Sequence, residues 1–360
     1  MSLAPTEEQN ELRSILRGFM ESKSSEEAVR TQMEDAVGYD AAVWTQLAEQ
    51  VGALGLAVPE ELGGAGFGLR ELGIVFEEGG RALYTGPLLG TTMATLAVLA
   101  SDDATATEEL LPELAAGRTG ALAWLDEAGR AAADLAVSAE SLTGTLSFVI
   151  DGSAADVLIV VNGSPNDDSI YVVDPNGPGV TRTALTTLDQ TRRQARIELD
   201  GAPARRLDTS GAAVLANVLD RAAVLVAAEQ VGAAEKTLEL AVEYAKIREQ
   251  FGRPIGSFQA IKHKCADMFV QVEAARSAAL FGLHSADENP DELPMAAAMA
   301  KAFCSEAFTF VATENIQVFG GVGFTWEHPA HLYYKRAKSM ELLLGSPSSH
   351  YERIAQMVGM

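Results

Sequence analysis

Two kinds of residue are scarce in this chain of 360 residues, and each shortage excludes a class of protein. Cysteine occurs only twice, which excludes a disulfide-rich secreted scaffold and favours a reducing, cytoplasmic setting. Basic residues number 27 against 50 acidic ones, so the net charge is −23. A surface of this sign repels nucleic acid and anionic lipid, and neither is expected as a partner.

Long uninterrupted hydrophobic runs are missing as well. The first eight residues lack the basic and apolar regions of a secretory signal. The most apolar stretch, 212–231, contains Asp220, Arg221 and Glu229, and a membrane span would rarely hold three such charges. We therefore expect a buried helix there and no membrane association.

Helical patterns dominate both ends of the chain, and a β-rich segment separates them. Thr6 and Gln9 have the spacing of a capping box, followed by apolar residues at helical intervals. Between 120 and 207, short β-branched runs alternate with turn residues, which predicts a small antiparallel β domain. Long helices with short connections then predict an antiparallel bundle. The expected helices span 39–51, 69–82, 86–99, 107–116, 210–248, 257–286, 292–319 and 328–343. The predicted domains are 1–118, 119–207 and 208–360.

Two segments of the last third carry residues suited to a dinucleotide. Residues 244–256 read YAKIREQFGRPIG, in which Arg248 offers a planar cationic fork for a pyrophosphate and Phe251 an apolar platform. Residues 316–324 read IQVFGGVGF, in which Gly320 and Gly321 allow close backbone approach and Gln317 supplies hydrogen bonds. Either segment alone is more typical of a turn or a helix-end salt bridge.

Together, and with a weaker loop at 59–64, these segments resemble the acyl-CoA dehydrogenase family. The resemblance implies an N-terminal helical domain, a middle antiparallel β-barrel and a C-terminal four-helix bundle, an α+β fold that is mostly helical. It also implies FAD as cofactor, an acyl-CoA substrate and an electron-transferring flavoprotein as acceptor. In the family these segments hold the adenine end of FAD bound chiefly by the neighbouring subunit. The positions that match are Arg248, Gln250, Phe251, Gln317, Gly320 and Gly321.

The family pattern fails where a subunit builds its own active site. A Thr-Glu-x-x-x-Gly-Ser-Asp loop is replaced at 124–130 by WLDEAGR, and Ile150 stands where a threonine hydroxyl normally faces the flavin. Leu344 occupies the position of the usual catalytic glutamate, and leucine cannot accept a proton. Asp220 is the candidate for a displaced base, ahead of Glu229 and Glu341. His328 and His331 lack a third ligand nearby, so no metal site is expected.

Three functions are compatible with this pattern. The favoured one is a partner subunit, similar to the degenerate subunit that actinobacterial acyl-CoA dehydrogenases pair with a catalytic homologue in a heterotetramer. The resemblance extends to pairs that act on bulky steroid side-chain CoA thioesters. The second is a self-sufficient homo-oligomeric dehydrogenase that uses Asp220 as its base. The third is a flavin-free scaffold or binding protein.

Overall fold

The computed structural model describes residues 4–130, 135–138, 140–164, 167–207 and 209–360. Residue contacts group the chain into two compact units, each assembled from separate stretches of sequence. Unit 1 comprises Met1–Val29, Leu69–Tyr84 and Ala223–Met360. Unit 2 comprises Arg30–Gly68 and Thr85–Ala222.

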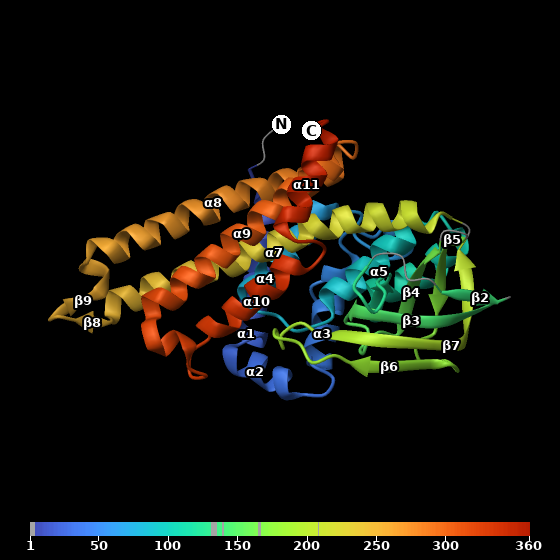
Figure 1. Ribbon diagram of the computed structural model, residues 1–360, viewed down its shortest axis with the longest axis horizontal. Helices are drawn as coiled ribbons and strands as arrows, with labels where there is room; N and C mark the ends of the chain where they lie inside the picture. The colour runs from blue at the N-terminus through green and yellow to red at the C-terminus, as the bar shows by residue number, and fades with distance from the viewer. Residues whose placement is uncertain (1–3, 131–134, 139, 165–166, 208) are drawn as a thin grey trace. The chain divides into compact units, whose positions relative to one another are not determined.

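Unit 1 is helical, and its core is built from small side chains. Alanines such as Ala227, Ala279 and Ala300 are at most 3% exposed, so three long helices pack at close range. Figure 1 shows these helices running side by side. The helices of unit 1, including two that begin or end in unit 2, are α1 (Glu7–Lys23), α2 (Glu26–Glu34), α4 (Leu69–Arg81), α7 (Gly211–Ile247), α8 (Gln259–Glu288), α9 (Leu293–Phe319), α10 (Ala330–Leu342) and α11 (Pro347–Met357).

The four long C-terminal helices were expected from the sequence, and α2 and α11 were not. In α11, Ser346 accepts a hydrogen bond from the backbone of Ser349, and Pro347 occupies the first turn. This is a helix start that the serine-rich sequence concealed. Both α7 and the segment Leu293–Phe324 are long and apolar enough to cross a membrane. Their most apolar windows are 61% and 67% buried inside the protein, which identifies them as core helices.

The capping box at the start of α1 is confirmed. The Thr6 hydroxyl accepts from the Gln9 backbone at 3.2 Å, and the Gln9 side chain accepts from the Thr6 backbone at 3.0 Å. Thr6→Ala is expected to lower the free energy of unfolding by about 1 kcal/mol, because one helix donor loses its acceptor. Denaturant unfolding measures this loss. Thr6→Ser keeps the hydroxyl and should stay close to the wild type; an equal loss in both variants would contradict the cap.

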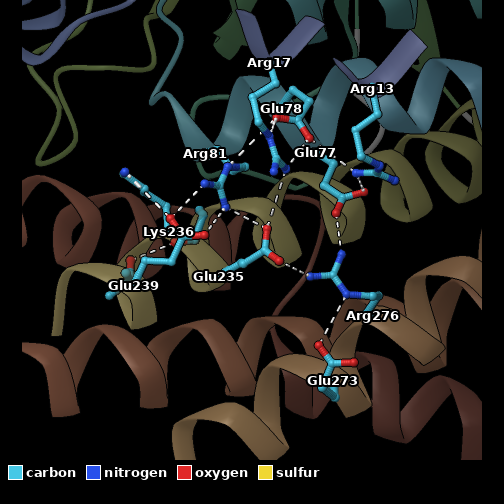
Figure 2. A network of polar contacts seen from close by, with 12 residues as sticks. Arg13, Arg17, Glu77, Glu78, Arg81, Glu235, Lys236, Glu239, Glu273 and Arg276 are labelled. Atoms are coloured by element: carbon cyan, nitrogen blue, oxygen red, sulfur yellow. Dashed lines mark hydrogen bonds and ion pairs between the residues drawn. The ribbon is translucent and has the colours of Figure 1, made fainter. Parts of the chain in front are cut away.

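A network of ion pairs crosses unit 1 and links α1, α4, α7 and α8 (Figure 2). Glu78 is 1% exposed and accepts hydrogen bonds from Arg17 at 2.8 and 2.9 Å and from Arg13 at 3.3 Å. Arg81 reaches Glu235 at 2.7 Å, and Arg276 reaches the same carboxylate at 2.8 Å. A buried carboxylate without its cation is costly, so this network favours one packing of the four helices.

Unit 2 contains a sheet with helices α3 (Ala41–Glu49), α5 (Leu88–Ala100) and α6 (Ala104–Ala115). Strand order is β1-β4-β5-β7-β3-β2, with β6 also pairing with β7. The strands are β1 (Gly120–Ala123), β2 (Ala136–Ser138), β3 (Ser141–Ile150), β4 (Val157–Ser164), β5 (Asp167–Val173), β6 (Val180–Ala184) and β7 (Gln194–Leu207). The sheet buries Leu142, Leu158 and Ile197.

The predicted antiparallel barrel needs correction. Among the described residues the strand order runs from β1 to β2 without closing, and β1 pairs with β4 in parallel, with Gly120 opposite Val157. Sequence patterns mark strands but not their partners, because pairing over tens of residues depends on packing rather than on local composition. The short strands β2 and β6 were not predicted, since their residues are largely exposed and show no apolar alternation.

Candidate functional site

A short β-hairpin with a two-residue turn forms the tip of the α7–α8 pair in unit 1 (Figure 1). Strands β8 (Glu249–Gln250) and β9 (Arg253–Pro254) pair across it. Its central residues, Phe251 and Gly252, both have positive φ, 54° and 76°, as a type I′ turn requires. The Phe251 side chain is 92% exposed, which leaves its ring available to a ligand or a partner.

Arg248 lies between the end of α7 and this hairpin. Its backbone is held at both ends, since its N–H donates to the Tyr244 carbonyl at 2.9 Å and its own carbonyl accepts from Ile255 at 2.7 Å. Its exposed guanidinium has no hydrogen-bond or ion-pair partner in the described part of the chain. A cationic fork on a rigid backbone suits the oxygens of a diphosphate.

The tertiary structure brings the second motif to the same end of unit 1. Tyr244 on α7 stacks on Phe319, the last residue of α9, with ring centroids 4.1 Å apart. Gly320 follows with φ 62° and ψ −140°, a conformation that only glycine adopts readily. A Cβ placed on Gly320 or Gly321 would meet no atom within 4 Å, so this backbone is open to a ligand.

These residues fit the diphosphate and adenine part of FAD. The unpartnered fork of Arg248, the exposed ring of Phe251 and the open backbone at Gly320 offer charge, apolar contact and close approach. Gln250 directly precedes Phe251, Gln317 lies shortly before Gly320, and both glutamines are exposed. The Gln250 amide donates to the Glu249 carbonyl at 2.8 Å. Their assignment to FAD remains a prediction.

Leu344 lies between α10 and α11, within a short loop of unit 1, residues 343–346. It adopts φ 57°, which is uncommon for a non-glycine residue. His350 lies 3.0 Å from its carbonyl oxygen and donates an Nε2–H to it in the matching tautomer. The position therefore has a well-held backbone and a half-buried apolar side chain with no proton-accepting group.

The other carboxylates considered as bases differ in their surroundings. Glu229 is 6% exposed and forms an ion pair with Arg336, which is 1% exposed. Glu341 forms an ion pair with Lys338 on the same helix. Each of these two carboxylates is therefore already engaged by a cation of this chain. Asp220 is 5% exposed on the part of α7 that belongs to unit 2, and its role as a base stays a prediction.

The structure also describes the two places in unit 2 where the sequence departs from the family pattern. Ile150 ends β3 opposite Gln194 and is 1% exposed, so an apolar side chain fills that place. The loop at 124–130 closes on itself, because the Asp126 carboxylate accepts from the backbone of Ala128 at 2.8 Å and of Arg130 at 2.9 Å. These bonds, foremost those from Arg130, hold the pKa of Asp126 below its ordinary value.

Sequence reasoning missed two buried cations of unit 1. The pairing of Arg336 with Glu229 was not foreseen from the sequence. Lys301 is 0% exposed within the alanine-rich stretch 296–302, and it was not considered. A single lysine in the otherwise apolar stretch 293–304 was the available signal, because charged side chains are almost never fully buried without a reason.

Comparison with known proteins gives a consistent result over nearly the whole chain. Residues 6–118 match the family model "Acyl-CoA dehydrogenase, N-terminal domain", and residues 209–359 match "Acyl-CoA dehydrogenase, C-terminal domain". The acyl-CoA dehydrogenase IpdE2 of Mycobacterium tuberculosis is 39% identical over 357 residues, which cover 99% of each chain.

Two solved structures of complexes share the fold along its full length. The ChsE4–ChsE5 complex from Mycobacterium tuberculosis superposes with a TM-score of 0.90 at 28% identity, covering 99% of each chain. A variant of the Tcur3481–Tcur3483 steroid ACAD superposes with a TM-score of 0.89 at 30% identity, covering 98% of each chain.

Proposed function

The chain belongs to the acyl-CoA dehydrogenase family, and we propose that it is the partner subunit of a heteromeric member. In this role it supplies cofactor contacts to an active site seated mainly in a homologous catalytic subunit. The proposal rests on a contrast between the residues offered to a neighbouring subunit and those in the chain's own site. Arg248 and Phe251 face outward and are available, whereas Ile150 and Leu344 stand where the chain's own site would need polar groups.

The proposed reaction is the α,β-desaturation of an acyl-CoA thioester. FAD, when bound, would accept the hydride that leaves the β-carbon. Removal of the α-proton needs a base, and Leu344 cannot serve as one. We therefore assign proton abstraction to the catalytic partner. Arg248 would hold the diphosphate of the cofactor by charge-assisted hydrogen bonds, and Phe251 would support its adenine end.

The substrate and the remaining partners follow from the same proposal. The superposed Tcur3481–Tcur3483 structure is a steroid ACAD, which supports a bulky CoA thioester of the steroid side-chain type. We further propose a heterotetramer with two copies of each subunit, an electron-transferring flavoprotein as acceptor and a cytoplasmic location. The division into domains at 118 and 207 also remains a proposal.

The decisive experiment compares the lone chain with the chain co-expressed with a homologous catalytic subunit. We expect the purified lone chain to be colourless and inactive. The complex should be yellow, contain one flavin for each pair of unlike subunits and convert acyl-CoA to enoyl-CoA. Visible absorbance, native mass measurement and turnover with an artificial electron acceptor provide the three readouts.

Two other outcomes would replace this proposal. Stoichiometric flavin and enoyl-CoA production by the lone chain would identify a self-sufficient dehydrogenase, and Asp220→Asn would then test its base. A complex that forms without any flavin would identify a scaffold instead.

A further inference from the structure

A fully buried lysine lies on α9 without an ionic partner. Lys301 is 0% exposed, and its ammonium donates to the Ser305 hydroxyl at 2.9 Å and to the Gly345 carbonyl at 3.1 Å. No carboxylate lies within ion-pairing distance of Lys301 in the described ranges of the chain. Burial lowers the pKa of this lysine from 10.5 to about 8.

The lysine belongs to a buried chain of hydrogen bonds that joins three helices. The Gln230 amide of α7 donates to the Ser305 hydroxyl at 3.0 Å and to the Met340 carbonyl of α10 at 3.4 Å. Gln230, Ser305 and Lys301 are each 0% exposed. Such a network holds its members in one arrangement, because a buried polar group that loses its partner is costly.

The far end of this network is the loop that carries Leu344. Leu344 and Gly345 both have positive φ, 57° and 105°. A Cβ on Gly345 would meet His350 Nε2 and Ser349 Oγ, each at 3.0 Å, so α11 packs closely against the loop. A non-glycine residue such as Leu344 persists in this conformation only where its surroundings hold it, and the bond from the Lys301 ammonium to the next residue supplies one such contact.

Stability alone does not explain a lysine at this place. An ammonium buried without a carboxylate carries a large desolvation cost, and a methionine of similar length would avoid it. We propose that Lys301 is a positioning residue, which holds the 343–346 loop by a charge-assisted hydrogen bond to the Gly345 carbonyl, and that this hydrogen bond weakens when the ammonium loses its proton. The proposal stands whether or not the chain acts as a partner subunit.

The titratable and polar groups near Lys301 lie on its own helix and on the helices packed against it. Its own helix contributes Cys304, whose pKa burial raises to about 12, so the thiol stays neutral. Helix α10 contributes Glu341, already paired with Lys338, and Arg336, paired with Glu229 of α7. Helix α11 contributes His350, and α8 contributes the Ala275 carbonyl that accepts from the Cys304 thiol at 3.3 Å. Among these, Cys304 and then Glu341 act to raise the pKa of Lys301, and burial lowers it by more.

A rise in pH is expected to loosen the 343–346 loop but to increase the free energy of unfolding of the whole chain. Below about pH 8 the lysine is protonated in the folded and in the unfolded chain. Between about pH 8 and 10.5 only the unfolded chain keeps the proton, so this group adds to the free energy of unfolding as pH rises. In the same window the hydrogen bond from Lys301 to the loop loses its charge assistance, which weakens it, and the loop should loosen.

Hydrogen–deuterium exchange of the 341–350 segment tests the proposal on the full-length chain. In the wild type we expect exchange, normalised to intrinsic rates, to rise about tenfold as pH passes about 8. Lys301→Met should exchange about tenfold faster already at pH 7 and show no step. Lys246→Met, which removes an exposed ammonium in the last turn of α7, should behave like the wild type.

Three results would overturn the proposal. They are a wild-type segment without the step, a step that persists in Lys301→Met, and a Lys301→Met segment as protected as the wild type at pH 7. The wild-type series decides the question even if Lys301→Met does not fold. No flavin or partner is needed, so failure here is separate from failure of the proposed function.

Discussion

Replacing Arg336 by methionine is expected to lower the free energy of unfolding by about 3–5 kcal/mol. The guanidinium is 1% exposed on α10 and forms an ion pair with Glu229 on α7, which is 6% exposed. The substitution removes that guanidinium, and the desolvation cost of the buried Glu229 carboxylate is then no longer offset by this cation. Denaturant unfolding, followed by both far-UV circular dichroism and tryptophan fluorescence, measures the loss.

A double variant separates the buried charge from the packing. Arg336→Met combined with Glu229→Leu removes both charges, and we expect most of the stability to return. Lys338→Met on the same helix breaks a partly exposed pair with Glu341 and should cost about 1 kcal/mol, well below the loss in Arg336→Met. If the double variant is as unstable as the single one, the loss comes from side-chain packing and the ion pair is not its cause.

Arg248→Ala is expected to weaken FAD binding by the assembled complex about tenfold or more. The guanidinium forms no hydrogen bond or ion pair within the described part of this chain, so its removal should leave the fold unchanged. The expected loss corresponds to one or two charge-assisted hydrogen bonds to a diphosphate. Fluorescence titration of the flavin-free complex with FAD measures the affinity, and absorbance gives the flavin content after purification.

Lys246→Ala is the matched control. Lys246 is an exposed cation in the last turn of α7, two residues before Arg248, and it is paired with Glu243 at 2.6 Å. Its loss changes the net charge by the same amount as the loss of Arg248. We expect unchanged FAD affinity in this control. Equal affinity in Arg248→Ala and wild type would remove the support for a cofactor contact in trans.

Much of the helical fold could be predicted from the sequence, because helices depend on local patterns. The Thr6 cap and the four long C-terminal helices were recognised from spacing within single turns. The failures share a cause. Strands β2 and β6 are short and largely exposed, and α11 begins in a serine-rich stretch, so the local pattern gave little signal for any of them.

The residues of the candidate site were proposed from motifs, and their role stays a prediction. Arg248, Phe251 and Gly320 were found by motif, since glycine and arginine are confined by turn geometry and by ligand chemistry. The sequence could not show that Arg248 lacks an internal partner, or that Glu229 has one in Arg336. Such partners lie on other helices, and no spacing rule connects them.

By itself, the sequence determined the family and the absence of an acidic side chain at position 344, because both are properties of residue identity and order. Only the tertiary structure decided three other matters. It stacks Tyr244 on Phe319, which brings the two motifs to one end of unit 1. It leaves the sheet open, and it buries Lys301 against the Gly345 carbonyl. Each depends on contacts between residues far apart in the chain, where packing and desolvation rather than local pattern select the arrangement.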